Sequence, residues 1–462
     1  MDGHGKEMIR LAITESVAAR LERELLDDSG RENGAFCLVR AGSGHVGTRL
    51  LVTNVLALPH DAWERRGDAV LRPSAKWISA AISHAISTKA GLLFVHSHPD
   101  PRFPVGFSWI DMESFQALGA TLAPMLEGPF AAAVVHPHGW AGVVWNKAGI
   151  KPIGRIVSAG RIMRFLNPIP ELESSQLDSR QQDALGIVHD RVRLLTAAVV
   201  GAGGLGSPIA EQLVRMGVSE VYLIDHDLLD TESNVRRVFG ARMQDLRPDQ
   251  PQPKVEVVGR HLDEIGLGAR VHRIKGDVRE EVLFRHLLDA DVVFSATDTH
   301  SSRAVLNELA STYLLPVIDT GVRVSSKTNK RLAGLVAEVR VLTPSTPCLW
   351  CRRVLGADII RAENLPENER DRLRREGYVV DGAGAPVPSV AALTVLGSGL
   401  ATCAMLTLLS EEGDVASSGY VVDGFLGYSI AIGPKEPKPG CRCRQQLGLG
   451  DSSAPPFRAG CE

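Results

Sequence analysis

Two histidines, a serine and an aspartate stand close together in the first third of this 462-residue chain. His96 and His98 close an apolar run typical of a strand, and Ser108 and Asp111 open a stretch typical of a helix. Alternate residues of a strand project to one side, so both imidazoles can face the same ion. Zinc accepts imidazole nitrogen and carboxylate oxygen, and three protein ligands leave a position for an attacking water. The spacing therefore predicts a catalytic zinc bound by His96, His98 and Asp111.

A second group of residues suits phosphate chemistry. A glycine-rich turn joins an apolar run at 194–200 to a helical pattern, so backbone N–H groups and a helix N-terminus can hold phosphate. Asp225 ends the next apolar run, where an acid commonly binds ribose hydroxyls. The glycines predicted to bind nucleotide are Gly201, Gly203, Gly204 and Gly206.

The residues after this turn decide which nucleotide is expected. Asn234, Arg237, Lys254 and Asp298 add amide, cationic and carboxylate groups to the same fold. Attack of a carboxylate on the α-phosphate of ATP brings two anions together, and such groups, with magnesium on the aspartate, offset the charge of the departing pyrophosphate. A dehydrogenase that binds NAD is the alternative, because the glycine turn alone is common to both.

Four of the seven cysteines form close pairs. Cys348 with Cys351, and Cys441 with Cys443, supply the four thiolates of a closed structural zinc site. A redox Cys-x-x-Cys motif is the alternative. Cys403 stands in an apolar stretch and is expected to be a buried structural thiol.

The bulk composition is that of an ordinary soluble protein. Hydrophobic residues make up 44% and charged residues 23%, and the net charge of −3 favours no nucleic-acid partner. The polar start predicts no signal peptide and, with paired cysteines, a cytoplasmic protein. The uncharged stretch 382–410 contains prolines and glycines, which favours a helix buried in protein over a membrane span.

The periodicity predicts an N-terminal α+β domain at 1–160, beginning with a helix at 8–28. Strands are expected at 35–39, 50–56, 91–95, 131–135 and 142–145, with a helix at 108–125. A Pro- and Ser-rich linker at 161–177 precedes a domain at 178–445, in which strands alternate with helices and predict a doubly wound parallel sheet. The last residues, 446–462, are expected to be a disordered tail.

The first constellation resembles the JAB/MPN (JAMM) metallopeptidases, which combine His-x-His-Pro with Ser-x-x-Asp and an upstream glutamate. The resemblance covers residues 8–160 and implies that Glu32 is the general base and that Ser108 donates to the oxyanion. Nine residues separate His98 from Ser108, two more than is usual in that family. A non-catalytic scaffold is therefore the alternative.

The second constellation is similar to the ThiF/MoeB superfamily, the adenylating core of ubiquitin-activating enzymes, over residues 178–445. The resemblance implies ATP with magnesium as cofactor, phosphate contacts from Asn234, Arg237 and Lys254, and a magnesium or in-line role for Asp298. It also implies that Arg180 is inserted by a second subunit, hence a homodimer. Many members of that superfamily carry a four-cysteine zinc site.

Together the two resemblances describe opposite operations on one carboxyl group. A peptidase would trim the tail of a ubiquitin-like or sulfur-carrier protein, and the second domain would adenylate the exposed C-terminal glycine. The fold class expected is α/β, with an N-terminal α+β JAMM-like domain followed by a Rossmann-like ThiF/MoeB-type domain. A conjugating-enzyme-like protein or a sulfurtransferase is the expected acceptor, and the choice between conjugation and sulfur transfer stays open.

Overall fold

The computed structural model describes residues 8–59, 61–67, 71–146, 149–173, 175–327, 331–375, 389–410, 419–424, 426–431 and 436–453. The chain forms two compact units. The N-terminal unit comprises Met1–Glu171 with Thr312–Leu314 and Gln446–Ser453, and the C-terminal unit comprises Leu172–Ser311 and Leu315–Gln445.

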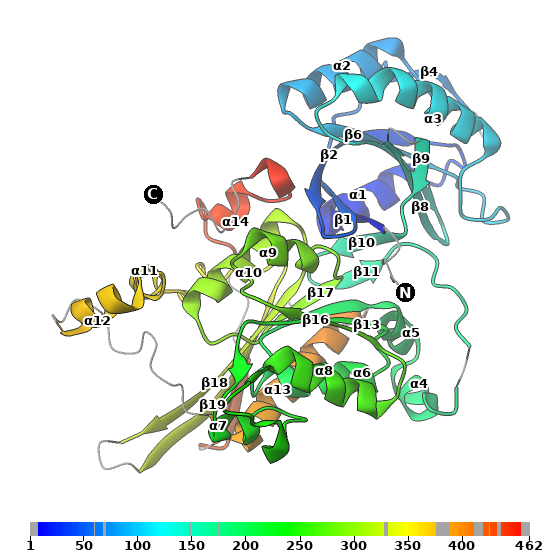
Figure 1. Ribbon diagram of the computed structural model, residues 1–462. Coiled ribbons are helices and arrows are strands. Elements are labelled where there is room, and N and C mark those ends of the chain that lie inside the picture. The colour runs from blue at the N-terminus through cyan, green and yellow to red at the C-terminus, as the bar shows by residue number, and fades with distance from the viewer. Residues whose placement is uncertain are drawn as a thin grey trace. The chain divides into compact units, whose positions relative to one another are not determined.

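The N-terminal unit is a mixed sheet with helices on both faces (Figure 1). Its described strands follow the order β11-β10-β1-β3-β2-β6-β7-β8-β9. Its elements are β1 (Ile9–Thr14), α1 (Glu15–Leu25), β2 (Gly34–Ser43), β3 (Thr48–Val55), β4 (Trp63–Arg66), β5 (Leu71–Pro73), α2 (Ala75–Ser87), β6 (Gly91–Ser97), α3 (Trp109–Leu122), η1 (Ala123–Met125), β7 (Phe130–His136), β8 (Gly139–Asn146), β9 (Gly149–Pro152), β10 (Arg155–Ala159), β11 (Met163–Phe165) and η4 (Gly450–Ser452).

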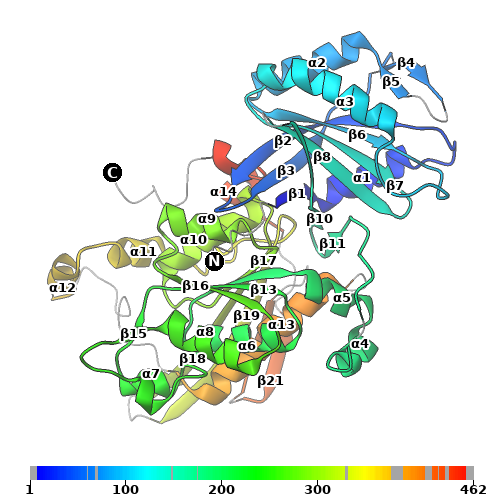
Figure 2. The ribbon, with the colours of Figure 1, turned by 45° about the vertical axis from the view of Figure 1, so that its right-hand side comes forward.

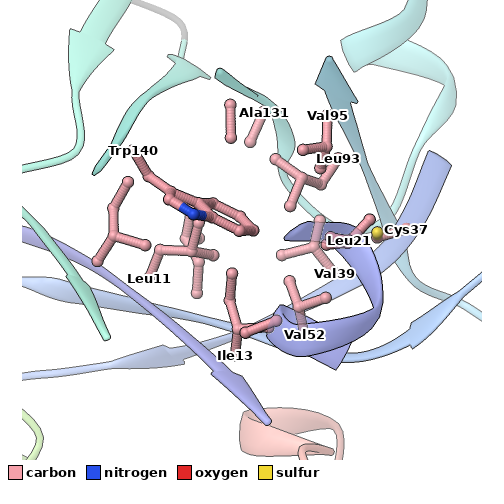
Figure 3. Packing of buried hydrophobic residues seen from close by; sticks show 14 of the residues in the cluster. Leu11, Ile13, Leu21, Cys37, Val39, Val52, Leu93, Val95, Ala131 and Trp140 are labelled. Atoms are coloured by element: carbon pink, nitrogen blue, oxygen red, sulfur yellow. The ribbon is translucent and has the colours of Figure 1, made fainter. Parts of the chain in front are cut away.

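Two hydrophobic layers hold this sheet between its helices. On one face, the Trp140 indole lies among side chains of β1, β2, β3, β6, β7 and α1, including Leu11, Val39 and Leu21 (Figure 3). On the other face, α2 and α3 pack through Trp77 and Phe115 against the sheet. The predicted strands and the helix at 108–125 are therefore confirmed.

The helix predicted over 8–28 is wrong in its first half. Ile9–Thr14 is a strand, paired in parallel with β3 and β10, and all six of its residues are buried. A short run that is buried on both faces carries no two-residue alternation, so its period does not separate strand from helix. The helix α2 was not predicted at all.

Two segment expectations also need correction. Met163–Phe165 is strand β11, paired with β10, so the linker does not begin at 161. Residues 446–453 are not a disordered tail, because they include η4 and belong to the N-terminal unit. Asp451 accepts hydrogen bonds from the backbone N–H of Ser43 (2.8 Å) and the Tyr313 hydroxyl (3.1 Å). The rest of the expected tail, 454–462, lies outside the described residues.

The C-terminal unit is built on a second sheet with the strand order β16-β13-β12-β17-β18-β19-β20-β21. Its elements are α4 (Ser179–Leu185), α5 (Ile187–Leu194), β12 (Thr196–Val200), α6 (Gly206–Arg215), β13 (Glu220–Asp225), β14 (Leu228–Leu229), α7 (Glu232–Val235), η2 (Met243–Asp245), β15 (Gln252–Pro253), α8 (Lys254–Ile265), β16 (Arg270–Lys275), α9 (Glu281–Leu287), β17 (Val292–Ser295), α10 (His300–Thr312), β18 (Val317–Ser326), β19 (Leu332–Leu342), α11 (Ala357–Glu363), α12 (Glu367–Arg375), α13 (Ala391–Leu409), β20 (Gly419–Asp423), β21 (Tyr428–Ala431) and α14 (Arg442–Gln445).

Five of the eight described strands of this sheet match the doubly wound expectation. Strands β16, β13, β12, β17 and β18 run parallel, with α6, α8 and α13 on one side and α9 and α10 on the other (Figure 2). Strands β19, β20 and β21 continue the sheet in antiparallel order, which was not predicted. In a parallel sheet, the C-terminal strand ends form the edge that binds ligands.

Helix α13 is the one described helix that is long and apolar enough to cross a membrane, and 56% of its most hydrophobic window is buried. It packs against α6, β18 and β19 of its own unit, which supports the expectation of a helix buried in protein. Cys403 of this helix is exposed, so its assignment as a buried thiol is wrong. A helix that is apolar on every side gives no signal for which face is buried.

The position of Gly450 tests how residues 446–453 belong to the N-terminal unit. Gly450 has a φ of +53°, and a Cβ there would overlap the carbonyl oxygen of Ala41 on β2. Gly30 of the same unit has a φ of +65°, but a Cβ there meets no described atom within 4 Å. We expect Gly450→Ala to lower the free energy of unfolding by about 1–3 kcal/mol more than Gly30→Ala, because overpacking adds to the shared backbone strain. Urea unfolding of the two variants measures this; equal losses would contradict the packing of this segment.

Candidate metal and nucleotide sites

Strand pairing gathers the first constellation at one end of the N-terminal sheet. His96 is on β6 opposite Gly34 of β2, so Glu32, just before β2, comes close to His98, just after β6. Asp111 reaches the same point from the first turn of α3. Its carboxylate oxygens lie 3.3 Å from His96 Nε2 and 3.3 Å from His98 Nε2, and Glu32 Oε1 lies 3.9 Å from His98 Nε2. The predicted ligands and base therefore share one place.

The donor set fits a divalent metal ion. One ligand atom each from His96, His98 and Asp111 lies within 4.8 Å of the others. Both ring nitrogens of His96 are buried, and neither makes a well-formed hydrogen bond within the described residues. The ring stacks on Phe94 and has Phe107 nearby, which keeps it fixed. A buried imidazole nitrogen without a well-formed hydrogen bond costs stability, and a metal ion bound there would remove that cost.

The charges at this site are strongly coupled. Burial raises the pKa of Glu32 to about 7, and the negative Asp111 adds to this effect, although His98 opposes it. Burial alone would raise the pKa of Asp111, but His96, His98 and Ser108 together hold it well below the ordinary range. Burial alone would lower the pKa of His98, but Asp111 and Glu32 raise it. Asp111 is thus kept as a carboxylate, the form that binds metal.

Ser108 has a structural role in this arrangement. It is the N-cap of α3, where its hydroxyl accepts from the N–H of Asp111 (3.2 Å) and donates to the Asp111 carboxylate (2.7 Å). Such a capping box fixes the first turn of the helix and with it the metal-facing carboxylate. The oxyanion role of Ser108 stays a prediction.

His136 is a neighbouring residue whose contact the sequence did not reveal. It is buried at the end of β7, and its Nε2 lies 3.2 Å from the carbonyl oxygen of Asp100. This contact holds the chain just after His98 and Pro99. The contact with the Asp100 carbonyl arises from the parallel pairing of β6 and β7, which brings the ends of these two strands together.

The glycine turn of the C-terminal unit is closely packed. Gly201 has a φ of +101°, which L side chains rarely adopt. A Cβ on Gly206 would overlap the Gly201 carbonyl oxygen. Asp225 joins this turn to the next strand: its carboxylate accepts from the N–H of Ala202 (2.5 Å) and from the N–H of Asp227 (2.7 Å). Each carboxylate oxygen has a second lone pair, so the predicted ribose contact stays open to Asp225.

The predicted phosphate-binding residues converge beside this turn. Asn234 is buried on α7, and its side-chain oxygen accepts from Arg237 Nη2 (2.8 Å). Arg237 stands next to the turn, because a Cβ at Gly204 would lie 3.6 Å from the Arg237 Cβ. The Nε of Arg237 is buried with no hydrogen-bond partner among the described residues, as expected of a group that binds an anionic ligand.

Lys254 completes this group from the start of α8. Its side chain is 8% exposed and its Nζ lies 2.5 Å from Asp227 Oδ2. The antiparallel pair β14 and β15 brings Lys254 to Asp227, and the Lys254 N–H donates to the Asp227 carbonyl (3.0 Å). Asp227 is a site residue that the sequence analysis did not assign.

Two predicted residues stand apart from these contacts. Asp298 is exposed in the segment after β17, whose backbone at Ala296 packs against Gly201. This location at the C-terminal strand edge agrees with a role at the nucleotide, which no contact tests. Arg180 is exposed on α4. Its insertion into a second subunit stays a prediction.

The four cysteines form one cluster in the C-terminal unit. Cys348 Sγ lies 3.7 Å from Cys441 Sγ, and Cys351 Sγ lies 3.8 Å from Cys443 Sγ. Four thiolates around zinc at about 2.3 Å stand roughly 3.8 Å apart, so the spacing fits a tetrahedral ion. The N–H groups of Cys351 and Lys438 point at the sulfurs of Cys348 and Cys351.

The thiol charges in this cluster also favour a metal ion. A hydrogen bond from Cys443 lowers the pKa of Cys348 to about 5. The Cys348 thiolate in turn raises the pKa of Cys443. Without a cation, the four cysteines therefore lose a first proton easily, and the resulting thiolate opposes the loss of a second proton. A divalent ion removes that conflict, which favours structural zinc over a redox pair.

The C-terminal unit thus has a Rossmann-type α/β fold, with Arg237 beside its glycine turn and Lys254 paired with Asp227. The model of the ThiF family matches residues 179–443, more than half of the chain, and the protein belongs to the ThiF family. This assignment gives no support to the NAD dehydrogenase alternative. The N-terminal metal site lies outside the matched residues.

Two curated proteins and one solved structure illustrate the similarity. Sulfur carrier protein ThiS adenylyltransferase of Bacillus subtilis (strain 168) is 32% identical over 155 residues, 34% of this chain and 43% of that protein. Ubiquitin-like modifier-activating enzyme 5 of Drosophila willistoni is 26% identical over 277 residues, 56% of this chain and 60% of that protein. A crystal structure of MccB from E. coli has 16% identity and a TM-score of 0.44, covering 58% of this chain and 74% of that chain. The chain thus spans about half the length of these two curated relatives.

Metal content tests the two clusters separately. We expect the full-length protein to bind two zinc ions, and Cys443→Ser and His98→Ala each to lose about one, because each removes a ligand from a different site. Cys403→Ser is the matched control, since Cys403 is exposed and outside both clusters. Elemental analysis of the purified proteins measures this; unchanged zinc in Cys443→Ser would exclude the four-cysteine site.

Proposed function

We propose that the C-terminal unit adenylates the C-terminal glycine carboxylate of a ubiquitin-like or sulfur-carrier protein, using ATP and magnesium. Membership of the ThiF family carries this proposal, and the position of Arg237 beside the glycine turn supports it. The named relatives act on a sulfur carrier and on ubiquitin-like modifiers, which favours a carrier of this kind.

The chemistry is a displacement at phosphorus. A carboxylate oxygen of the carrier attacks the α-phosphorus of ATP, and the bond from that phosphorus to the bridging oxygen of pyrophosphate breaks. The products are an acyl-adenylate and pyrophosphate. Arg237, Lys254 and the backbone N–H groups at 201–206 bind the phosphates, and their positive charge opposes the charge that develops on the leaving group. Asn234 orients Arg237, and Asp298 would hold magnesium.

The carrier enters as an extended chain. Glycine at its end has no side chain, so the backbone can approach the α-phosphate closely. A second copy of this chain inserts Arg180 next to the phosphates, so the active form is a homodimer in the cytoplasm, with no membrane or nucleic-acid partner.

The acyl-adenylate can react further in two ways. The higher identity with a ThiS adenylyltransferase favours sulfur transfer, with a sulfurtransferase as acceptor. Conjugation to a target protein, through a conjugating-enzyme-like acceptor, is the second. The stretch from Arg352 to Thr402 contains no cysteine, which leaves thioester formation by that stretch without a nucleophile.

The N-terminal unit is proposed to be a JAMM-like metallopeptidase that exposes this glycine. The gathering of Glu32, His96, His98 and Asp111 supports the proposal. His96, His98 and Asp111 would hold a zinc ion, which would supply an activated water at such a site. Attack of the water oxygen on the scissile carbonyl carbon would break the C–N bond; Glu32 would carry the water proton to the leaving amine, and Ser108 would donate to the carbonyl oxygen. The product carboxylate is the substrate for adenylation.

ATP–pyrophosphate exchange tests the adenylation. We expect exchange that depends on a carrier ending in glycine, and a loss of about a hundredfold or more in Arg237→Ala, because the phosphate contacts act in the transition state. Mass spectrometry of the carrier would then show an added AMP. Arg236→Ala, an exposed neighbour, serves as the control. Exchange without any carrier dependence would refute the proposed substrate.

A cleavage assay tests the peptidase. A carrier extended by a short C-terminal peptide is incubated with the full-length protein, and mass spectrometry follows the shortened product. We expect His98→Ala and Glu32→Gln to abolish cleavage, because they remove a metal ligand and the base, and His138→Ala to keep it. His138 is an exposed histidine outside the cluster. A zinc-loaded protein that cleaves nothing would instead be the scaffold alternative.

A further inference from the structure

The ammonium group of Lys254 has a counterion. Only 8% of its side chain is exposed, and Asp227 Oδ2 lies 2.5 Å from its Nζ. A charge buried to this degree is unstable unless another group compensates it, and removal of one partner of such a pair is strongly destabilising. Before any phosphate arrives, Asp227 is the group that compensates Lys254.

The backbone fixes this pair as well as the side chains. The Lys254 N–H donates to the Asp227 carbonyl (3.0 Å), and Leu228 pairs with Pro253 in the adjoining two-stranded ladder. The N–H of Asp227 in turn donates to Asp225 (2.7 Å), whose other oxygen accepts from Ala202 in the glycine turn (2.5 Å). A continuous chain of contacts therefore connects the glycine turn to the Lys254 side chain.

From this chain of contacts we infer that Asp227 is a positioning residue for adenylation: it holds Lys254 at the glycine turn until ATP phosphate replaces it. The inference rests on the proposed function, and it gives the Asp225-His226-Asp227 turn a role that nothing above assigns. Asp227 does not touch the reacting atoms. It acts through Lys254.

The charges around Asp227 agree with this role. Burial alone would raise the pKa of Asp227, but the bond with Lys254 and the charges of Lys254, His226 and Arg237 hold it below the ordinary range. Asp227 is thus ionised and interacts with both cationic residues of the pocket. The Asp227 side chain is 48% exposed, so water can hydrate its carboxylate when the Lys254 ammonium moves to a phosphate.

A magnesium site is the competing explanation of the same residues. One ligand atom each from Asp225, His226 and Asp227 lies within 4.8 Å of the others. However, Asp227 Oδ2 already pairs with the buried Lys254 ammonium, and Asp227 Oδ1 lies 3.2 Å from His226 Nε2. The local charge is therefore compensated, which favours the positioning role.

Nucleotide binding and exchange kinetics test the inference in the full-length protein. We expect Asp227→Asn to raise the KM for ATP and lower kcat in ATP–pyrophosphate exchange, each by about tenfold, because Lys254 loses its preset position. Asp227→Glu is expected to restore part of the loss. Glu256→Gln is the matched control on α8, since it removes the Glu256–Arg273 pair (3.3 Å) and leaves Lys254 untouched.

A double-mutant cycle separates positioning from general structural damage. In a Lys254→Met background, Asp227→Asn should cause less than about a twofold further loss, because Asp227 acts only through Lys254. Independent losses that multiply would overturn the inference.

Acetylation of Lys254 provides a measurement that does not depend on catalysis. Trace acetic anhydride labels free amines, and mass spectrometry compares Lys254 with the other lysines. We expect Asp227→Asn to increase Lys254 labelling at least about threefold, because the Asp227 carboxylate no longer holds and shields the amine. Unchanged labelling would overturn the inference even if the wild type adenylates a carrier. If Asp227→Asn increases Lys254 labelling as expected but the wild-type protein neither binds ATP nor exchanges pyrophosphate, the proposed function is refuted instead.

Discussion

The close approach of two glycines at the end of β12 is the constraint on which the nucleotide site depends. Helix α6 can begin directly after the strand only because Gly206 leaves room for the Gly201 carbonyl. That arrangement aims the helix N-terminus and the backbone N–H groups at one point beyond the sheet edge. Asp225 then ties the turn to β13 through the N–H of Ala202. A side chain at either glycine would displace the turn and every group whose position depends on the turn.

The cationic residues depend on this turn for a different reason. Lys254 is buried and Arg237 is half-buried, and they come from separate segments: Arg237 follows α7, and Lys254 begins α8. Such charges are tolerated because each has a local acceptor, Asn234 for Arg237 and Asp227 for Lys254. The Nε of Arg237 is buried and has no hydrogen-bond partner among the described residues, as expected of a group that binds an anion. The site is thus preorganised for an anion while it stays electrically balanced without one.

The sequence could predict the parts that depend on spacing along the chain. The strand–turn–helix at 196–215, the start of the helix at 109 and the Cys-x-x-Cys pair all follow from local pattern. It could not predict Asp227, because the partner of Lys254 is set by a two-stranded ladder between segments far apart in sequence. Ile9–Thr14 was predicted to be helical, because a fully buried strand lacks the alternation of apolar and polar residues that identifies a strand. The exposed Cys403 and the packed segment at 446–453 were missed because tertiary contacts alone decide them.

In the N-terminal cluster of His96, His98 and Asp111, the buried charge that needs compensation is negative. The two imidazoles and the Ser108 helix cap keep Asp111 ionised. Glu32, by contrast, lies beside that negative charge and is partly buried, so its proton is held more tightly than in water. Two carboxylates with opposite displacements of pKa at one site can divide their roles, one as a ligand and the other as a proton carrier. The His96 nitrogens are buried and make no hydrogen bonds of good geometry among the described residues, so a cation bound there would stabilise this arrangement.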